Sequence, residues 1–191
     1  MSEIKLLIGD FSKSSWSLRP WLFLKHHNVP FEETVIALDQ PDTRAKLLRH
    51  SPTGKVPLLI HGKVKIWESL AICEYTAETF ALPRAWPLEP DQRALARALS
   101  CEMLSGFADL RRELPFNPRL APHERKLGDK ACTDLARLLD IFKDMREAYG
   151  RCGRAKDEGW LFGSFGIVDA MFAPTALRLH QYAVPVKGAA M

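Results

Sequence analysis

Four serines crowd one short stretch near the amino terminus of this 191-residue chain. They lie in residues 12–20 (SKSSWSLRP), where an apolar strand-like run gives way to an apolar helix-like run. The N–H groups of a helix's first turn have no partner within the helix, and the helix dipole is positive there. The stretch therefore predicts either a site where hydroxyl and N–H groups bind an anion, or a serine cap followed by loop serines.

A second stretch with chemical potential is residues 54–58 (GKVPL). Peptide bonds that precede proline are the ones that can be cis, so Val56–Pro57 indicates a special turn at the start of a strand. In such a turn the N–H and C=O of Val56 are free to pair with an extended, peptide-like ligand. The alternative is an ordinary strand entry.

The pair Glu68-Ser69 forms a third candidate site, at a predicted strand-to-helix corner after Trp67. The Ser69 hydroxyl and the neighbouring N–H groups at a helix start can hold a carboxylate, and Glu68 can hold an ammonium group. Together they match the free ends of an amino acid. Helix capping with a favourable dipole interaction is the simpler alternative.

Composition excludes several classes of protein. Hydrophobic residues make up 47% and charged residues 26% of the chain, which is typical of a globular domain. The basic residues behind the net charge of +4 are spread along the sequence and form no cluster, so we expect no binding to nucleic acid. No apolar run is long enough to span a membrane, and the amino terminus has no secretory pattern, so we expect a cytoplasmic protein that binds no membrane. The chain has four cysteines, Cys73, Cys101, Cys132 and Cys152. None of them forms a Cys-x-x-Cys pair, so we expect no metal site.

The elements that must position these residues differ between the two halves of the chain. The first half predicts strands and helices in the order strand, helix, strand, helix, strand, strand, helix, over residues 4–9, 16–27, 31–38, 43–50, 58–60, 64–67 and 69–80. This order predicts a small mixed sheet, since a helix between the first two strands permits a parallel crossover and the turn at Gly62 makes the last pair antiparallel.

The second half reads as helix throughout. Residues 81–90 contain three prolines and are predicted to be a linker between a domain over 1–80 and a helical domain over 91–191. Apolar residues recur every three or four positions over 95–114 and again over 127–145, which predicts two helices that pack as an antiparallel pair. A further helix is predicted over 167–181.

Taken together, the three candidate sites resemble those of the cytosolic glutathione transferases. That family has serines after the first strand, Val-Pro before the third and Glu-Ser after the fourth, and residues 14–19 (SSWSLR) resemble its serine-type, zeta-like branch. Residues 166–174 (GIVDAMFAP) resemble the family's folding motif at the start of a buried helix. The resemblance implies an α/β thioredoxin-like N-terminal domain and an all-α C-terminal domain.

The resemblance also implies roles for individual residues. Ser14 is the first candidate for the hydroxyl that activates the thiol of glutathione, and Ser15 is the second. The backbone of Val56, held by Pro57, pairs with the cysteinyl part of glutathione. Lys55, or else Arg44 or Lys46, reaches the glycine carboxylate.

Glu68 and Ser69 take the γ-glutamyl end in this scheme, and a small electrophilic substrate lies between the two domains. The family usually forms homodimers, so the resemblance implies a homodimer as well. The implied activity is transfer of glutathione to small electrophiles, and the implied cofactor or cosubstrate is glutathione.

Several departures from the family pattern keep alternatives open. Trp16 stands where isomerases of the zeta branch carry cysteine, yet glutathione-dependent cis-trans isomerisation like that of maleylacetoacetate isomerase remains the second hypothesis. Gly166 stands where the folding motif has Ser or Thr. The chain ends at Met191, so the helical domain is expected to be short for the architecture, which favours a non-catalytic binding module as a third hypothesis. Cysteine-based reductase or peroxidase chemistry ranks last, because no cysteine precedes Cys73.

Overall fold

The computed structural model describes residues 3–150 and 157–186, and Cys152 lies outside these ranges. The chain forms two compact units, Met1–Pro83 and Arg84–Met191, and the division falls within the proline-rich segment 81–90. Among the helices in the described ranges, none is long and apolar enough to cross a membrane.

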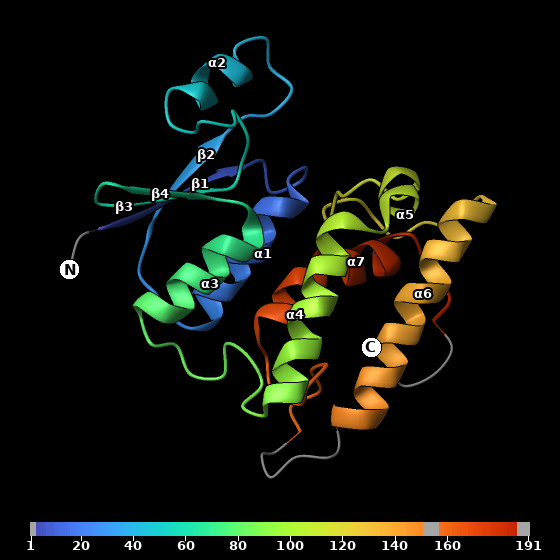
Figure 1. Ribbon diagram of the computed structural model, residues 1–191. Helices are drawn as coiled ribbons and strands as arrows, with labels where there is room; N and C mark the ends of the chain where they lie inside the picture. The colour runs from blue at the N-terminus through green and yellow to red at the C-terminus, as the bar shows by residue number, and fades with distance from the viewer. Residues whose placement is uncertain (1–2, 151–156, 187–191) are drawn as a thin grey trace. The chain divides into compact units, whose positions relative to one another are not determined.

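A four-stranded mixed sheet forms the centre of the first unit (Figure 1). Its order is β2-β1-β3-β4, with β1 over Ile4–Gly9, β2 over Glu32–Ile36, β3 over Leu58–His61 and β4 over Val64–Trp67. β2 is parallel to β1, because α1 (Ser15–His26) connects them, whereas β3 is antiparallel to both β1 and β4. The predicted mixed sheet is confirmed.

The boundaries of these elements have local causes. α1 ends at His26, and Asn28 follows with a φ of 53°, a left-handed conformation that asparagine tolerates at the end of a helix. β2 stops at Ile36, short of the predicted residue 38, because the N–H of Leu38 donates to the Asp10 carboxylate at 2.7 Å instead of continuing the ladder.

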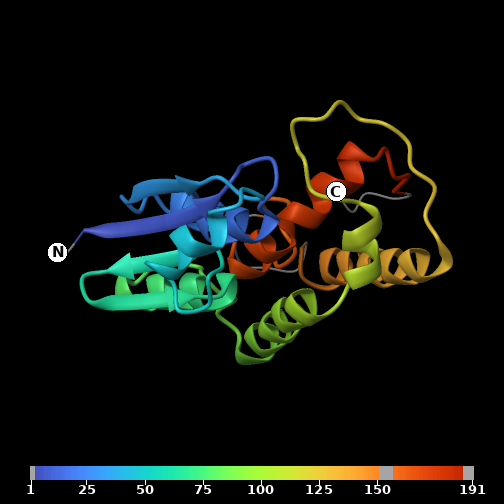
Figure 2. The same cartoon turned by 90° about the horizontal axis from the view of Figure 1, so that it is seen from above.

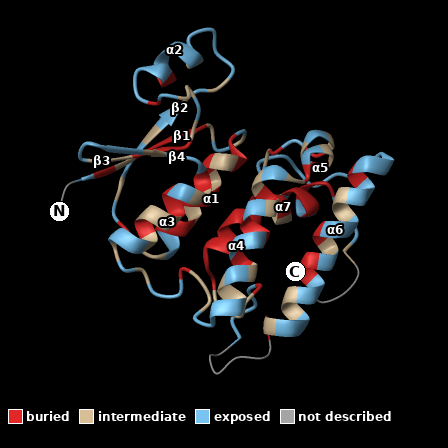
Figure 3. Cartoon of the chain, in the orientation of Figure 1, coloured by how far each residue is buried: buried red, intermediate tan, exposed pale blue. Residues whose placement is uncertain are grey.

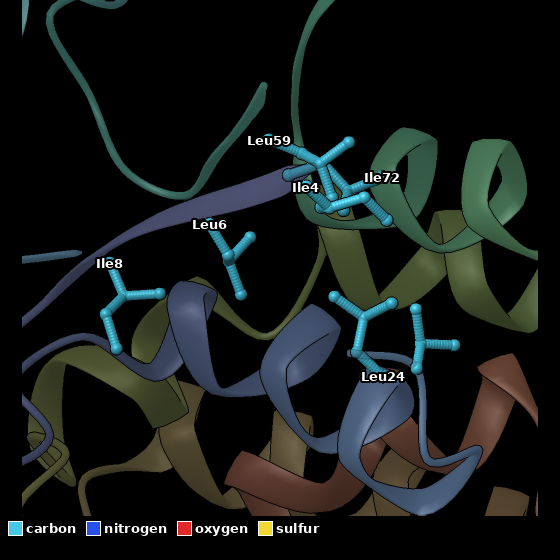
Figure 4. Close-up of a cluster of buried hydrophobic side chains, with 7 residues drawn as sticks. Ile4, Leu6, Ile8, Leu24, Leu59 and Ile72 are labelled. Atoms are coloured by element: carbon cyan, nitrogen blue, oxygen red, sulfur yellow. The ribbon is translucent and has the colours of Figure 1, made fainter. Parts of the chain in front are cut away.

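The core of the first unit lies between the sheet and two helices, α1 and α3 (Ser69–Thr79), which pack side by side (Figures 1 and 4). Alternate residues of β1 point to the same face of the sheet, since side chains alternate along a strand. The buried apolar cluster consists of Ile4, Leu6, Ile8, Leu24, Val29, Leu59 and Ile72. A short helix, α2 (Thr43–Leu48), lies between β2 and β3 in the chain.

The second unit is helical. Its elements are α4 (Pro90–Ser105), α5 (Ala108–Glu113), α6 (Asp129–Met145), a π-helical turn η1 (Arg146–Gly150) and α7 (Ile167–Gln181). α7 is buried along most of its length and packs against α4, while α5 packs against α6 (Figure 3). A long loop connects α5 to α6 (Figure 2).

One predicted helix, over 95–114, is wrong as a single element. α4 ends at Ser105, and Phe107 has a φ of 57°, so the chain turns before α5 starts. Arg111 stabilises the break, because its guanidinium donates to the carbonyl of Met103 at 3.2 Å and to that of Gly106. Apolar residues keep a spacing of three or four positions across the break, because Phe107 and Leu110 are both buried.

The start of α7 contains the predicted folding motif. The Asp169 carboxylate accepts the N–H of Gly166 at 2.9 Å and the N–H of Leu161 at 2.9 Å. Glycine is tolerated at position 166, and a Cβ there would come within 3.0 Å of the carbonyl oxygen of Ala85. The close approach of the chain before α4 therefore favours glycine over the Ser or Thr of the family motif.

Candidate functional site

The register of the sheet brings the three candidate segments to one end of it. Leu58 at the start of β3 pairs with Leu7 near the end of β1 and with Trp67 at the end of β4. The segment after β1 leads to the serines, Pro57 immediately precedes Leu58, and Glu68 immediately follows Trp67. The serine, Val-Pro and Glu-Ser segments therefore leave the sheet at the same end.

A tight turn links β1 to the first turn of α1. The carbonyl of Asp10 accepts the N–H of Lys13 and the N–H of Ser14, both at 2.9 Å. The Asp10 carboxylate also holds the chain after β2, through the N–H of Leu38. Asp10 thus fixes where the serine segment lies relative to both parallel strands.

Ser14 is the N-cap of α1. Its Oγ accepts the N–H of Ser17 at 3.2 Å and lies 2.7 Å from the Oγ of Ser17, which in turn accepts the N–H of Gly9 at 3.1 Å. Ser14 is 7% exposed and Ser17 is 3% exposed. The capping role that the sequence allows is therefore present, and it leaves a serine proton available for a further bond.

Ser15, the second serine candidate, is the first residue of α1 and is 5% exposed. Its carbonyl accepts a hydrogen bond from Nη1 of Arg19 at 3.1 Å, and the guanidinium of Arg19 stacks 4.0 Å from the centre of the Trp16 ring. Arg19 itself is fully buried. Ser15 is thus held in the interior by the first turn of its own helix.

A small, mainly apolar hollow adjoins Ser14. Its volume is about 230 Å³ including the open mouth, and its lining residues are Ile8, Gly9, Phe11, Ser14, Ser17, Leu18 and Trp21. Phe11 and Trp21 meet edge to face with their ring centres 6.0 Å apart. The surroundings of Ser14 are therefore poorly hydrated, which strengthens any hydrogen bond made there.

The Val56–Pro57 peptide bond is cis, as its sequence position suggests. Pro57 is buried and Val56 is half-buried. In the ranges that the structure describes, neither the N–H nor the C=O of Val56 has a backbone partner. Both groups are therefore able to bind an extended ligand at the start of β3.

The Glu68-Ser69 corner is tied to α1 by an unusual contact. The Ser69 hydroxyl donates to the carbonyl of Trp16 at 2.8 Å. That carbonyl lacks its usual helical donor, because the residue four positions later is Pro20, which has no N–H. The hydroxyl of Ser69 is thus engaged within the protein, and the N–H groups of the first turn of α3 remain to bind an anion.

Glu68 has a φ of 69° and a ψ of 127°, a conformation that non-glycine residues rarely adopt. Its side chain is exposed and precedes α3, whose first turn contains no acidic residue. Strained backbone of this kind clusters at binding sites, where the surrounding structure holds it in place. The strain supports a binding role for this corner.

Basic side chains flank the Val-Pro turn. Lys55 is exposed, and Nη1 of Arg44 lies 3.8 Å from the position that a Cβ on residue 54 would occupy. Lys46, the other basic candidate on α2, forms an ion pair with Asp42 at 2.8 Å. Lys55 and Arg44 are therefore the better placed pair for an anionic group.

The surroundings of Cys73 in the first unit do not favour catalysis by its thiol. Cys73 is fully buried on α3, and burial raises the pKa of its thiol far above the usual value, against a smaller opposite effect of Arg19. The described residues also contain no cluster of histidine, cysteine and acidic side chains that could hold a metal ion.

Sequence reasoning missed two parts of the site. It treated Ser17 as one serine of a cluster, although the spacing of three residues from Ser14 is the spacing of a cap and its N3 residue. It also missed the hollow, since Phe11 and Trp21 carry no motif and meet only because α1 folds back along β1.

The part of the chain that holds the candidate site is similar to a known protein family and to several known proteins. The model of the family described as glutathione S-transferase, N-terminal domain, matches residues 13–79, a range that contains Ser14, the Val-Pro turn and the Glu-Ser corner. The chain is 36% identical over 110 residues to a probable maleylacetoacetate isomerase of Caenorhabditis elegans, a match over 58% of this chain and 51% of that protein. It is 42% identical over 98 residues to a probable glutathione S-transferase of Nicotiana tabacum, over 51% of this chain and 42% of that protein. The chain thus spans about half the length of the curated relatives it matches.

Solved structures resemble the chain over nearly its whole length. A glutathione transferase homologue from Burkholderia GL BGR1, solved with bound glutathione, is 25% identical with a TM-score of 0.68, over 98% of this chain and 86% of that one. The Tau class glutathione S-transferase of mango, Mangifera indica, has the same fold with a TM-score of 0.70 at 20% identity, over 97% of this chain and 81% of that one. Residues 13–79 thus match the glutathione S-transferase N-terminal domain, and the chain has the fold of the glutathione transferases, with a thioredoxin-like N-terminal domain and an all-α C-terminal domain.

Proposed function

We propose that this protein binds glutathione at the end of the sheet where the three segments meet and transfers it to small electrophiles. The observation that carries the proposal is the placement of a buried serine hydroxyl pair, a cis Val-Pro turn and a strained Glu-Ser corner at one end of the sheet. Glutathione offers a matching set of groups, since it is an extended peptide with a thiol in the middle and charged ends.

Each end of the tripeptide has a complementary partner in this scheme. Glu68 binds the α-ammonium group of the γ-glutamyl end, and the N–H groups at the start of α3, beginning with Ser69, bind its carboxylate. The N–H and C=O of Val56, fixed by Pro57, pair with the cysteinyl residue as a strand edge pairs with a peptide. Lys55 binds the glycine carboxylate.

The serine segment supplies the chemistry. A free thiol has a pKa of about 8.5, so most of it is protonated at neutral pH. A hydroxyl that donates to the sulfur, at the positive end of α1, favours the thiolate, and each unit of pKa lowering requires about 1.4 kcal/mol. The thiolate then attacks an electrophilic carbon, a C–S bond forms, the leaving group departs with its electron pair, and the thiol proton passes to solvent.

Ser14 is the better placed of the two serines. Ser14 lines the hollow, and the bonded Ser14–Ser17 pair keeps one hydroxyl proton that its internal bonds do not use, whereas Ser15 is held in the interior of the first turn. Ser14 is therefore the proposed catalytic residue, with Ser15 as the alternative. We also propose that the protein is a cytoplasmic homodimer, because the cytosolic glutathione transferases that it resembles usually form homodimers.

The test is binding and turnover by the full chain. We expect glutathione binding in calorimetry and turnover of an activated aryl halide, with kcat/KM reduced at least tenfold by Ser14→Ala and little by Ser15→Ala. Ser100→Ala is a matched control, because Ser100 is also a buried serine but its Oγ donates to the helical carbonyl of Ala96. Unchanged turnover in Ser14→Ala, Ser15→Ala and the double variant would refute serine activation, and no glutathione binding would favour the non-catalytic module.

Isomerisation is the second candidate function, and the similarity to a probable maleylacetoacetate isomerase favours it. In an isomerase the thiolate adds to the substrate and later leaves, so glutathione is not consumed. Trp16 occupies the position of the zeta-branch cysteine, so only the serines can act on the thiol there. Measuring glutathione consumed per product distinguishes the reactions: one per product for transfer, and none for isomerisation.

A further inference from the structure

The hydroxyls of Ser14 and Ser17 have one proton more than the protein can accept. The Ser17 Oγ accepts the N–H of Gly9, the Ser14 Oγ accepts the N–H of Ser17, and a single bond of 2.7 Å joins the two oxygens. That bond uses one of the two hydroxyl protons. The other proton has no acceptor within the described residues, although both serines are more than nine-tenths buried.

The direction of the bond between the two oxygens decides which proton is left over. If Ser17 donates, the two lone pairs of Ser14 are filled by the N–H and the O–H of Ser17, and the proton of Ser14 is free. If Ser14 donates, the proton of Ser17 is the free one. An anion beside Ser14 selects the first arrangement, because only that arrangement gives the anion a hydrogen bond from Ser14.

We propose that Ser17 is a positioning residue that holds the proton of Ser14 toward the ionised sulfur of bound glutathione. The inference rests on the proposed function and assigns a new role within the same site. The Gly9 N–H donates to Ser17, Ser17 donates to Ser14, and Ser14 donates to the sulfur. Each donor in such a chain polarises the next, so the last hydroxyl becomes a better donor than an isolated serine.

The surroundings of the pair suit this role. Both serines line the apolar hollow with Phe11 and Trp21, where water competes poorly for the free proton. Gly9 contributes through its backbone and its lack of a side chain, because a Cβ there would come within 2.9 Å of the Ser14 Cβ. The end of β1 is therefore built closely around the serine pair.

The test measures the pKa of bound glutathione by the ultraviolet absorption of its thiolate, in the full-length wild type and in variants. We expect Ser17→Ala to raise that pKa by about half a unit to one unit, which means about three- to tenfold less thiolate below the pKa, with the KM for glutathione nearly unchanged. Ser17→Thr, which retains the hydroxyl, should restore much of the wild-type pKa. Ser100→Ala, which removes a buried hydroxyl in the helical unit, should leave it unchanged.

A double-mutant cycle separates positioning from direct contact. Since Ser17 acts through Ser14, adding Ser17→Ala to Ser14→Ala should change the thiol pKa little. An equal effect of Ser17→Ala in both backgrounds would mean that Ser17 touches the sulfur itself and would overturn the inference, as would an unaltered pKa in Ser17→Ala. If Ser17→Ala does not fold, Ser17→Cys takes its place, because a thiol is a weak hydrogen-bond donor. A wild-type pKa of bound glutathione in folded Ser17→Cys would also overturn the inference. A wild type that binds no glutathione refutes the proposed function instead.

Discussion

Asp169 carries the most quantitative prediction that the structure supports. It is the third residue of α7 and is 6% exposed. Burial raises the pKa of its carboxyl from 3.8 to about 7, although the N–H groups of Leu161 and Gly166 and the charge of Arg146 favour the ionised form. The folded chain therefore keeps a proton on Asp169 over a pH range in which the unfolded chain has released it.

The sign and size of the effect follow from this difference. A carboxyl whose pKa is raised on folding contributes most stability below its unfolded pKa, and the contribution is lost as the pH rises through the folded pKa. At 1.36 kcal/mol for each pKa unit, the rise from 3.8 to about 7 corresponds to about 4 kcal/mol. Most of that, about 3 kcal/mol, is lost between about pH 5 and about pH 8.

Urea unfolding of the wild type and of Asp169→Asn at those two pH values measures the effect. The stability margin of the wild type over the variant should shrink by about 3 kcal/mol on going from about pH 5 to about pH 8. Asp134→Asn is the control, because Asp134 also accepts a backbone N–H, that of Leu110 at 3.0 Å, at a half-exposed position. A margin that stays constant or grows with pH would show that Asp169 is not held in its protonated form.

Three further predictions concern the first unit. Gly9→Ala should destabilise the fold by about 1–3 kcal/mol and lower kcat/KM, because the new Cβ would lie 2.6 Å from Cδ1 of Leu38 and 2.9 Å from the Cβ of Ser14. Urea unfolding and turnover measure these effects, and wild-type values in both would contradict the prediction. Ser69→Ala should cost about 1–2 kcal/mol, because the carbonyl of Trp16 then loses its donor; an unchanged melting temperature would argue against this. The buried thiol of Cys73 should resist alkylation in the folded protein and react on unfolding, as mass spectrometry of the labelled chain will show; rapid labelling of the native chain would contradict the burial.

Much of the fold could be predicted because local signals agreed with the tertiary structure. β1 is an apolar run bounded by a polar turn, and the Asn28 and Pro30 pair marks the end of α1 in the sequence. The break between α4 and α5 could not be predicted, because Phe107 keeps the apolar periodicity while its backbone turns left-handed. The carbonyls that Arg111 binds there are adjacent only once the chain has folded.

The site shows the same division. Ser14, Val56 and Glu68 could be recognised as candidates, because each lies shortly before or after a predicted strand and carries a group suited to part of a peptide ligand. The partners of those groups could not, since they depend on contacts across the fold. The Ser69 hydroxyl is engaged by Trp16 only because Pro20 leaves that carbonyl without a helical donor.

The central claim is that the sulfur of glutathione lies against the Ser14 hydroxyl, and a crystal structure of the full chain with glutathione tests it most directly. We expect the sulfur within hydrogen-bond distance of Ser14 Oγ, the cysteinyl backbone paired with Val56, and the γ-glutamyl end at Glu68 and the start of α3. A tripeptide bound elsewhere, or a sulfur facing away from Ser14 while the other contacts form, would contradict the account.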